Sequence, residues 1–172
     1  MRCILNCAAP SPKNKYMKSD LPRRKKNRLD NYDYSQCGCY FITICADKRK
    51  KLFSRIVGGD DLGAPLSIEL KPYGKIVERY INSIETAYET VTVENYIIMP
   101  DHIHLMLLID CFGAPRSSPP TISSVISALK RFTNKECRCN LWQRGFYDHI
   151  VRNKFDYEEI WNYIEYNALK EY

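Results

Sequence analysis

The stretch that decides the fold is Val93-Glu94-Asn95-Tyr96-Ile97-Ile98-Met99-Pro100-Asp101-His102-Ile103-His104-Leu105-Met106-Leu107-Leu108-Ile109. Two apolar runs of strand length flank a Pro-Asp break, a pattern that predicts a β-hairpin. Because side chains alternate along a strand, His102 and His104 project from one face and Ile103 from the other. The chain has only three histidines, so this pair indicates part of a metal site. The alternative is two spectator histidines on a partly buried strand.

The length and composition fit one globular domain. The chain has 172 residues, of which 45% are hydrophobic and 12% are aromatic, which suits a single core. No apolar run approaches the roughly 20 residues that span a bilayer. The N-terminus resembles a secretion signal only faintly, because Asn6 interrupts its apolar segment and a basic stretch follows. We therefore expect a cytoplasmic protein with no membrane partner.

The charge is concentrated at the N-terminus. The formal net charge is +6, and residues 1–30 hold nine Lys and Arg against Asp20 and Asp30. We predict a flexible basic arm over residues 1–30 and a single domain over residues 31–172. A basic balance favours nucleic acid as partner, although ordinary solubility charge would look the same at this magnitude.

The order of elements predicts the fold class. Strands are expected at 39–45, 91–99 and 102–109, and the aromatic block 142–152 is expected to form a turn and then a short strand. Helices are expected at 71–89, after Thr121 or Ser123, and from Asp156, as N-cap, to Lys170. Residues 58–65 and 111–120 are expected to be loops, the first an insertion. The order β-α-β-β-α-β predicts an α+β, ferredoxin-like (split βαβ) antiparallel sheet with helices on one face, followed by a C-terminal helix.

The last helix carries a second candidate for chemistry. Tyr163 and Asn167 are four residues apart and share one helical face, so a hydroxyl and a carboxamide oxygen could serve as nucleophile and metal ligand. Tyrosines at helical spacing more often pack, and Ile160, Trp161 and Ile164 indicate that much of this helix is buried.

These motifs together resemble a known family. The run 99–107, with His-Ile-His at its centre, resembles the HUH motif of the single-tyrosine, IS200-like transposases. The block 142–152 and the run Tyr163-Ile164-Glu165-Tyr166-Asn167 resemble the C-terminal signature of the REP-associated tyrosine transposases. The resemblance covers roughly residues 37–170. One departure is Ala168, which stands where the family usually has proline, so the helix can continue.

The resemblance implies a catalytic site and a reaction. It makes Tyr163 the nucleophile and His102, His104 and Asn167 the ligands of Mg²⁺ or Mn²⁺, while Asp101 either orients an imidazole or only shapes the turn. The implied activity is metal-dependent cleavage and transfer of single-stranded DNA through a 5′-phosphotyrosine, at a REP-like hairpin or an element end. It further implies a bacterial, nucleoid-associated protein, and a monomer or a homodimer that exchanges the tyrosine.

Several cationic and aromatic residues are candidates for DNA contact. They are Lys130, Arg131, Lys135, Trp142, Arg144, His149 and Arg152. The aromatic residues could stack on unpaired bases or simply pack the core, and the cations could follow phosphates or form a solvated face. For His149 we expect a supporting or DNA-contacting role before direct metal ligation.

Two rival functions remain at this level. One is a replication-initiator or relaxase-type HUH nuclease, and the other is a ferredoxin-like nucleic-acid binder without catalysis. The position of the Tyr163 hydroxyl distinguishes an enzyme from a binder. In an enzyme the hydroxyl must reach the histidine pair, either of its own chain or of a partner chain.

Overall fold

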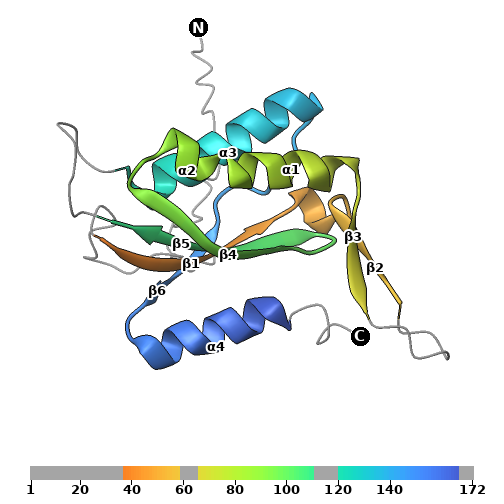
Figure 1. The fold of residues 1–172 in the computed structure, drawn as a ribbon. Coiled ribbons are helices and arrows are strands. Elements are labelled where there is room, and N and C mark those ends of the chain that lie inside the picture. Colours follow the sequence, from red (N-terminus) through yellow and green to blue (C-terminus); the bar gives the residue numbers. More distant parts are fainter. Residues whose placement is uncertain (1–36, 59–65, 111–119, 167–172) are drawn as a thin grey trace, which may run out of the picture.

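The computed structural model describes residues 37–58, 66–110 and 120–166 (Figure 1). The predicted basic arm, most of both predicted loops, and Asn167 lie outside the described residues. No helix in the described ranges is long and apolar enough to cross a membrane. The elements are β1 (Gly38–Cys45), η1 (Asp47–Arg49), β2 (Ser54–Val57), β3 (Ser67–Leu70), α1 (Pro72–Asn82), α2 (Ile84–Ala87), β4 (Val91–Ile98), β5 (His102–Ile109), α3 (Ile122–Cys137), β6 (Tyr147–Val151) and α4 (Lys154–Glu165).

The main sheet confirms the predicted α+β, ferredoxin-like fold. Its strand order is β4-β5-β1-β6, and every neighbouring pair is antiparallel. The first and third strands of the split βαβ pattern therefore lie side by side at the centre, and the second and fourth form the edges. The predicted hairpin of residues 91–109 is the β4–β5 pair, whose register places Ile98 opposite Ile103.

Side-chain alternation divides the sheet into two unlike faces. One face presents the fully buried Tyr40, Ile42 and Ile44 of β1, and Ile103 and Leu105 of β5, to the main hydrophobic core. Helices α1, α2 and α3 cover this face, whereas α4 lies across the opposite face (Figure 1). Each Å² of apolar area removed from water stabilises the fold by about 25 cal/mol. Because most of the buried apolar side chains lie in the main core, this core supplies most of that stabilisation.

A smaller cluster attaches α4 to the second face. Ile160 and Ile164 of α4 pack on Met106 of β5, with Phe41 at the margin. Polar contacts add to this attachment: the Tyr157 hydroxyl donates to Glu94 Oε2 at 2.8 Å, and β4 has a register shift between Val93 and Asn95 at this point. The bulged strand thus brings a carboxylate to the helix.

Three boundaries differ from the sequence-based expectation. The two-stranded sheet β2–β3 was not predicted, because strands of four residues beside a Gly- and Pro-rich stretch give little periodic signal. The predicted helix 71–89 is split at Ser83 into α1 and α2. The prediction that Asp156 caps the last helix was wrong: Asn153 is the N-cap, and its side chain accepts from the Asp156 backbone N–H.

Gly74 generates a prediction about stability. It is buried in α1, where a β-carbon would overlap the backbone carbonyl of Phe53. Because a backbone carbonyl cannot rotate away, Gly74→Ala should lower the free energy of unfolding by about 1–3 kcal/mol, despite alanine's better helix propensity. Chemical denaturation measures this, with the exposed neighbour Lys75→Ala as control. Equal stability of the two variants would contradict the close approach.

Candidate active site

The histidine pair lies on the face of the sheet that α4 covers. His102 and His104 are each 4% exposed, while Ile103 between them is buried in the main core on the other face. The prediction that both imidazoles project from one face is therefore confirmed. Burial of two polar rings without compensation would be costly, so their hydrogen bonds matter.

Asp101 contacts His102 directly. The Nδ1 atom of His102 lies 2.6 Å from Asp101 Oδ1, and the second carboxylate oxygen pairs with Nε of Arg49 at 2.9 Å. Because a carboxylate only accepts, Nδ1 of a neutral His102 carries the proton and Nε2 keeps its lone pair. Of the two roles predicted for Asp101, its position supports orientation of the imidazole.

His104 is held by groups from β1. Its Nδ1 lies 2.8 Å from Thr43 Oγ1, its Nε2 lies 3.1 Å from His102 Nε2, and its ring stacks on Phe41 with centroids 5.1 Å apart. Burial, followed by the charges of His102 and Arg49, lowers the pKa of His104 to about 3. His104 is therefore a neutral imidazole at physiological pH, the form that binds metal ions.

Helix α4 brings Tyr163 to the histidines within the same chain. The Tyr163 hydroxyl lies 3.4 Å from His104 Nε2, and the ring meets those of His104 and Phe41 edge-on, with centroids 5.2 and 5.9 Å apart. Buried Ile160 and Ile164 hold this part of the helix on the sheet. The tyrosine remains 38% exposed, so a substrate can approach it.

The two imidazoles fit a divalent cation. Their Nε2 atoms are 3.1 Å apart, close to the separation of neighbouring ligands around an octahedral cation bound at about 2.1 Å. Among the described residues, no group of three or more His, Cys, Asp or Glu side chains forms a metal site. A third protein ligand would thus be another residue type or lie outside the described ranges, as Asn167 does.

Two of the predicted DNA contacts have their partners within the fold. Trp142 is 3% exposed, packs on Phe53 at 4.7 Å between centroids, and donates from Nε1 to Thr133 Oγ1 at 2.8 Å. Its predicted stacking on unpaired bases was wrong. Lys130 donates to the backbone carbonyls of Gln143 and Gly145, and burial lowers its pKa to about 8. Both residues fix the segment before β6.

The remaining predicted contacts divide between the two faces. Arg131 and Lys135 are exposed on α3, across the sheet from the histidine pair (Figure 1). Arg144 is exposed before β6, and Arg152 is exposed between β6 and α4. Of these four, Arg152 immediately precedes the N-cap of α4, at the end of the helix opposite to Tyr163.

His149 connects β6 to the start of α4. Its Nε2 lies 2.9 Å from Asp156 Oδ2, and the Arg152 backbone N–H donates to the same oxygen. In the sheet register His149 lies opposite Phe41 of β1, two strands, or about 10 Å, from β5. Direct metal ligation, the second of the roles considered for His149, does not fit this placement.

Three residues of the site carried no sequence signal. Thr43, Phe41 and Arg49 contact the histidines or Asp101, yet they lie more than fifty residues earlier in the chain. The β1–β5 register, with Thr43 opposite His104, reveals Thr43 and Phe41, and the turn that follows β1 reveals Arg49. Lys48 and Arg49 both have φ of 53°, a left-handed conformation that costs about 1–2 kcal/mol per residue and places Arg49 on Asp101.

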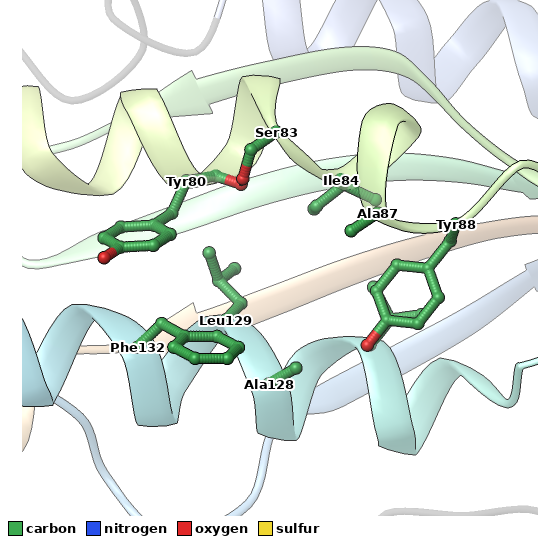
Figure 2. Close-up of a pocket in the computed structure, with 9 residues that line it drawn as sticks. Tyr80, Ser83, Ile84, Ala87, Tyr88, Ala128, Leu129 and Phe132 are labelled. Atoms are coloured by element: carbon green, nitrogen blue, oxygen red, sulfur yellow. The ribbon is translucent and has the colours of Figure 1, made fainter.

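A separate cavity lies on the opposite side of the sheet. It has a volume of about 320 Å³ and opens between α1, α2 and α3 (Figure 2). Tyr80, Tyr88 and Phe132 line it with small apolar side chains such as Ala128. Because α4 and the histidines occupy the other face, this cavity is not part of the candidate active site.

The fold and the arrangement of the site agree with the family that the sequence resembles. A ferredoxin-like sheet presents two histidines to a tyrosine of a helix packed on the same face. The chain belongs to the IS200-like transposase family, described as "Transposase IS200 like", which matches residues 39–167. The family resemblance drawn from the sequence is thereby confirmed.

Two proteins and one solved structure are similar to this chain over most of its length. An uncharacterised protein of Haemophilus influenzae is 28% identical over 169 residues, covering 87% of this chain and 90% of the relative. A putative REP-associated tyrosine transposase of the same organism is 27% identical over 165 residues, covering 83% and 77%. Among solved structures, a REP-associated tyrosine transposase bound to a REP hairpin shares the fold, with TM-score 0.60, 19% identity and coverage of 84% and 74%.

The contact between His149 and Asp156 generates a pH prediction. The hydrogen bond from His149, and after it the Arg152 backbone N–H, lowers the pKa of Asp156. A lowered folded-state pKa stabilises the fold above the unfolded value, about 3.9, and this stabilisation is lost as pH falls through the folded pKa. In His149→Ala the pKa of Asp156 should rise toward 3.9, as measured by carboxyl ¹³C NMR titration. An unchanged Asp156 titration would contradict the contact.

Proposed function

We propose that this chain is a metal-dependent endonuclease and strand transferase that acts on hairpin-bearing single-stranded DNA through a 5′-phosphotyrosine intermediate. The observation that carries the proposal is the 3.4 Å approach of the Tyr163 hydroxyl to His104 Nε2 within one chain. A non-catalytic binder would not require an exposed tyrosine hydroxyl beside two buried, metal-competent imidazoles. The geometry therefore favours the enzyme over the binder.

The histidines would hold Mg²⁺ or Mn²⁺. His102 and His104 would supply two Nε2 ligands, and Asn167 a carboxamide oxygen, a donor set that suits these cations with positions left for substrate and water. The bound cation would neutralise charge developing on the scissile phosphate. The low pKa of His104 supports this role, because no proton competes for its imidazole near neutral pH.

Tyr163 would carry out the covalent step. Attack by its phenolic oxygen on the phosphorus forms a Tyr–O–P bond, with the phenol proton released to solvent, and breaks the bond from phosphorus to the 3′ oxygen, which takes up a proton from solvent. The products are a 5′-phosphotyrosine and a free 3′-OH, so the bond energy is conserved for rejoining. Phe41 packs against both rings and would hold the Tyr163 phenol and the His104 imidazole in a fixed relative orientation.

The substrate we propose is single-stranded DNA with a hairpin near the cleavage point. The support is membership in the transposase family and the shared fold with a REP-associated transposase bound to a REP hairpin. The same membership favours a transposase over a replication initiator or relaxase. Because Tyr163 reaches the histidines of its own chain, we propose cleavage in cis, with no tyrosine required from a homodimer partner.

Tyr163→Phe tests the nucleophile. With Mn²⁺ and a hairpin-bearing single strand, the wild type should form a covalent protein–DNA adduct that survives denaturing electrophoresis, and Tyr163→Phe should form none. The matched control is Tyr166→Phe, since Tyr166 is an exposed tyrosine three residues later and should still form the adduct. Adduct formation by Tyr163→Phe would show that another residue attacks.

His102→Ala tests the metal site. Removing a residue that only hydrogen-bonds to a metal ligand lowers metal affinity by about 10–100-fold. Removing the ligand itself, as in His102→Ala, should therefore lower Mn²⁺ affinity by more than about 100-fold. Calorimetry measures the affinity, and a gel shift should show hairpin binding retained. His149→Ala, at the third histidine, should keep the Mn²⁺ affinity. Loss of fold and DNA binding together in His102→Ala would support a structural role instead.

A further inference from the structure

Arg49 is a cationic side chain that the fold holds beside the histidine pair. Its Nε lies 2.9 Å from Asp101 Oδ2, and the other carboxylate oxygen, Oδ1, lies 2.6 Å from His102 Nδ1. The Nη1 group of Arg49 donates to Cys45 Sγ at 3.1 Å. Because Asp101 contacts both groups, the guanidinium is fixed at the margin of the candidate active site, with one carboxylate between it and an imidazole.

The turn that places Arg49 there is conformationally unfavourable. Lys48 and Arg49 both have φ of 53°, in the left-handed region that residues with a β-carbon rarely adopt. The backbone just before them is fixed by a hydrogen bond of 2.8 Å from the Ala46 N–H to the Asp101 carbonyl oxygen. Strained backbone that the surrounding structure maintains is concentrated at functional sites. This turn therefore indicates a function for Arg49 beyond surface charge.

The guanidinium keeps donors available for a ligand. Of its several N–H groups, the one on Nε faces Asp101 and one on Nη1 faces Cys45. No other partner of the guanidinium lies within residues 37–58, 66–110 and 120–166, and 50% of the side chain is exposed. The remaining donors lie in the plane of the guanidinium, where their geometry matches two oxygens of a phosphate group.

Two exposed side chains flank the buried histidines. Contacts run without a break from Arg49 to Tyr163, through Asp101, His102 and His104. Both end residues are exposed, so one DNA strand can meet both. We propose that Arg49 binds a backbone phosphate of the strand whose scissile phosphate lies at Tyr163. This inference rests on the proposed function, because that strand is the proposed substrate, and it adds a phosphate contact that the histidines and Tyr163 do not supply.

The salt dependence of DNA binding tests this phosphate contact without cleavage and without metal. Each phosphate neutralised on a single strand contributes about 0.7 to the slope of log K against log salt concentration, through release of counterions. Fluorescence anisotropy in EDTA, with an end-labelled, hairpin-bearing single strand, measures the slope. Arg49→Gln should lower its magnitude by about 0.7, and Arg49→Lys, which keeps the charge, should retain the wild-type slope.

Two control variants separate this contact from other effects. Arg55→Gln removes an exposed arginine that pairs with Glu69 in the β2–β3 sheet, and it should keep the wild-type slope. Asp101→Asn removes the carboxylate and keeps the guanidinium charge, so its slope should not fall. A fall in either control as large as that in Arg49→Gln overturns the inference, because the slope would then not depend on a specific contact of Arg49.

The outcomes for Arg49 and for the proposed function are distinguishable. An unchanged slope in Arg49→Gln, with the wild type still forming the covalent adduct, overturns the phosphate contact alone. A lower slope in Arg49→Gln, where the wild type forms no adduct, supports the contact and counts against the cleavage step. A wild type that binds no single-stranded DNA in EDTA overturns the contact and the proposed substrate together.

Discussion

The alternation of side chains along β5 is the constraint on which the rest of the structure depends. Ile103, Leu105 and Leu107 enter the main core from one face, so His102 and His104 must emerge from the other. A shift of one residue in the strand register would bury the imidazoles among aliphatic side chains and expose the core residues to α4. The large apolar area on one face therefore positions the polar site on the opposite face.

Helix α4 is attached to the sheet by a small apolar cluster and a few polar contacts. Its cluster centres on Met106, Ile160 and Ile164, far fewer residues than the main core contains, and is supplemented by polar contacts from Glu94 and His149. Regions with few buried apolar contacts open locally at lower free energy than the whole domain unfolds. The helix that carries Tyr163 is thus the element of the site that can move most easily relative to the rigid histidine strand.

Local patterns in the sequence were sufficient for the element order, the shared face of His102 and His104, and the helix bearing Tyr163. They were insufficient for residues that reach the site only because two distant segments of the chain pair with each other. Thr43 and Arg49 join the site only through the β1–β5 register and a left-handed turn, which no periodicity encodes. Trp142 was misjudged because an aromatic residue among glycine and arginine looks exposed, although its indole is buried against Phe53.

The placement of the histidines away from the main core has an evolutionary consequence. Residues that contribute little to folding can be replaced by drift without loss of a stable protein, so descendants of such a chain can lose the proposed cleavage and keep their architecture. A host genome could then retain the domain for binding alone. In this chain the stability of the fold and the proposed reaction depend on different residues, and those around His104 serve the second.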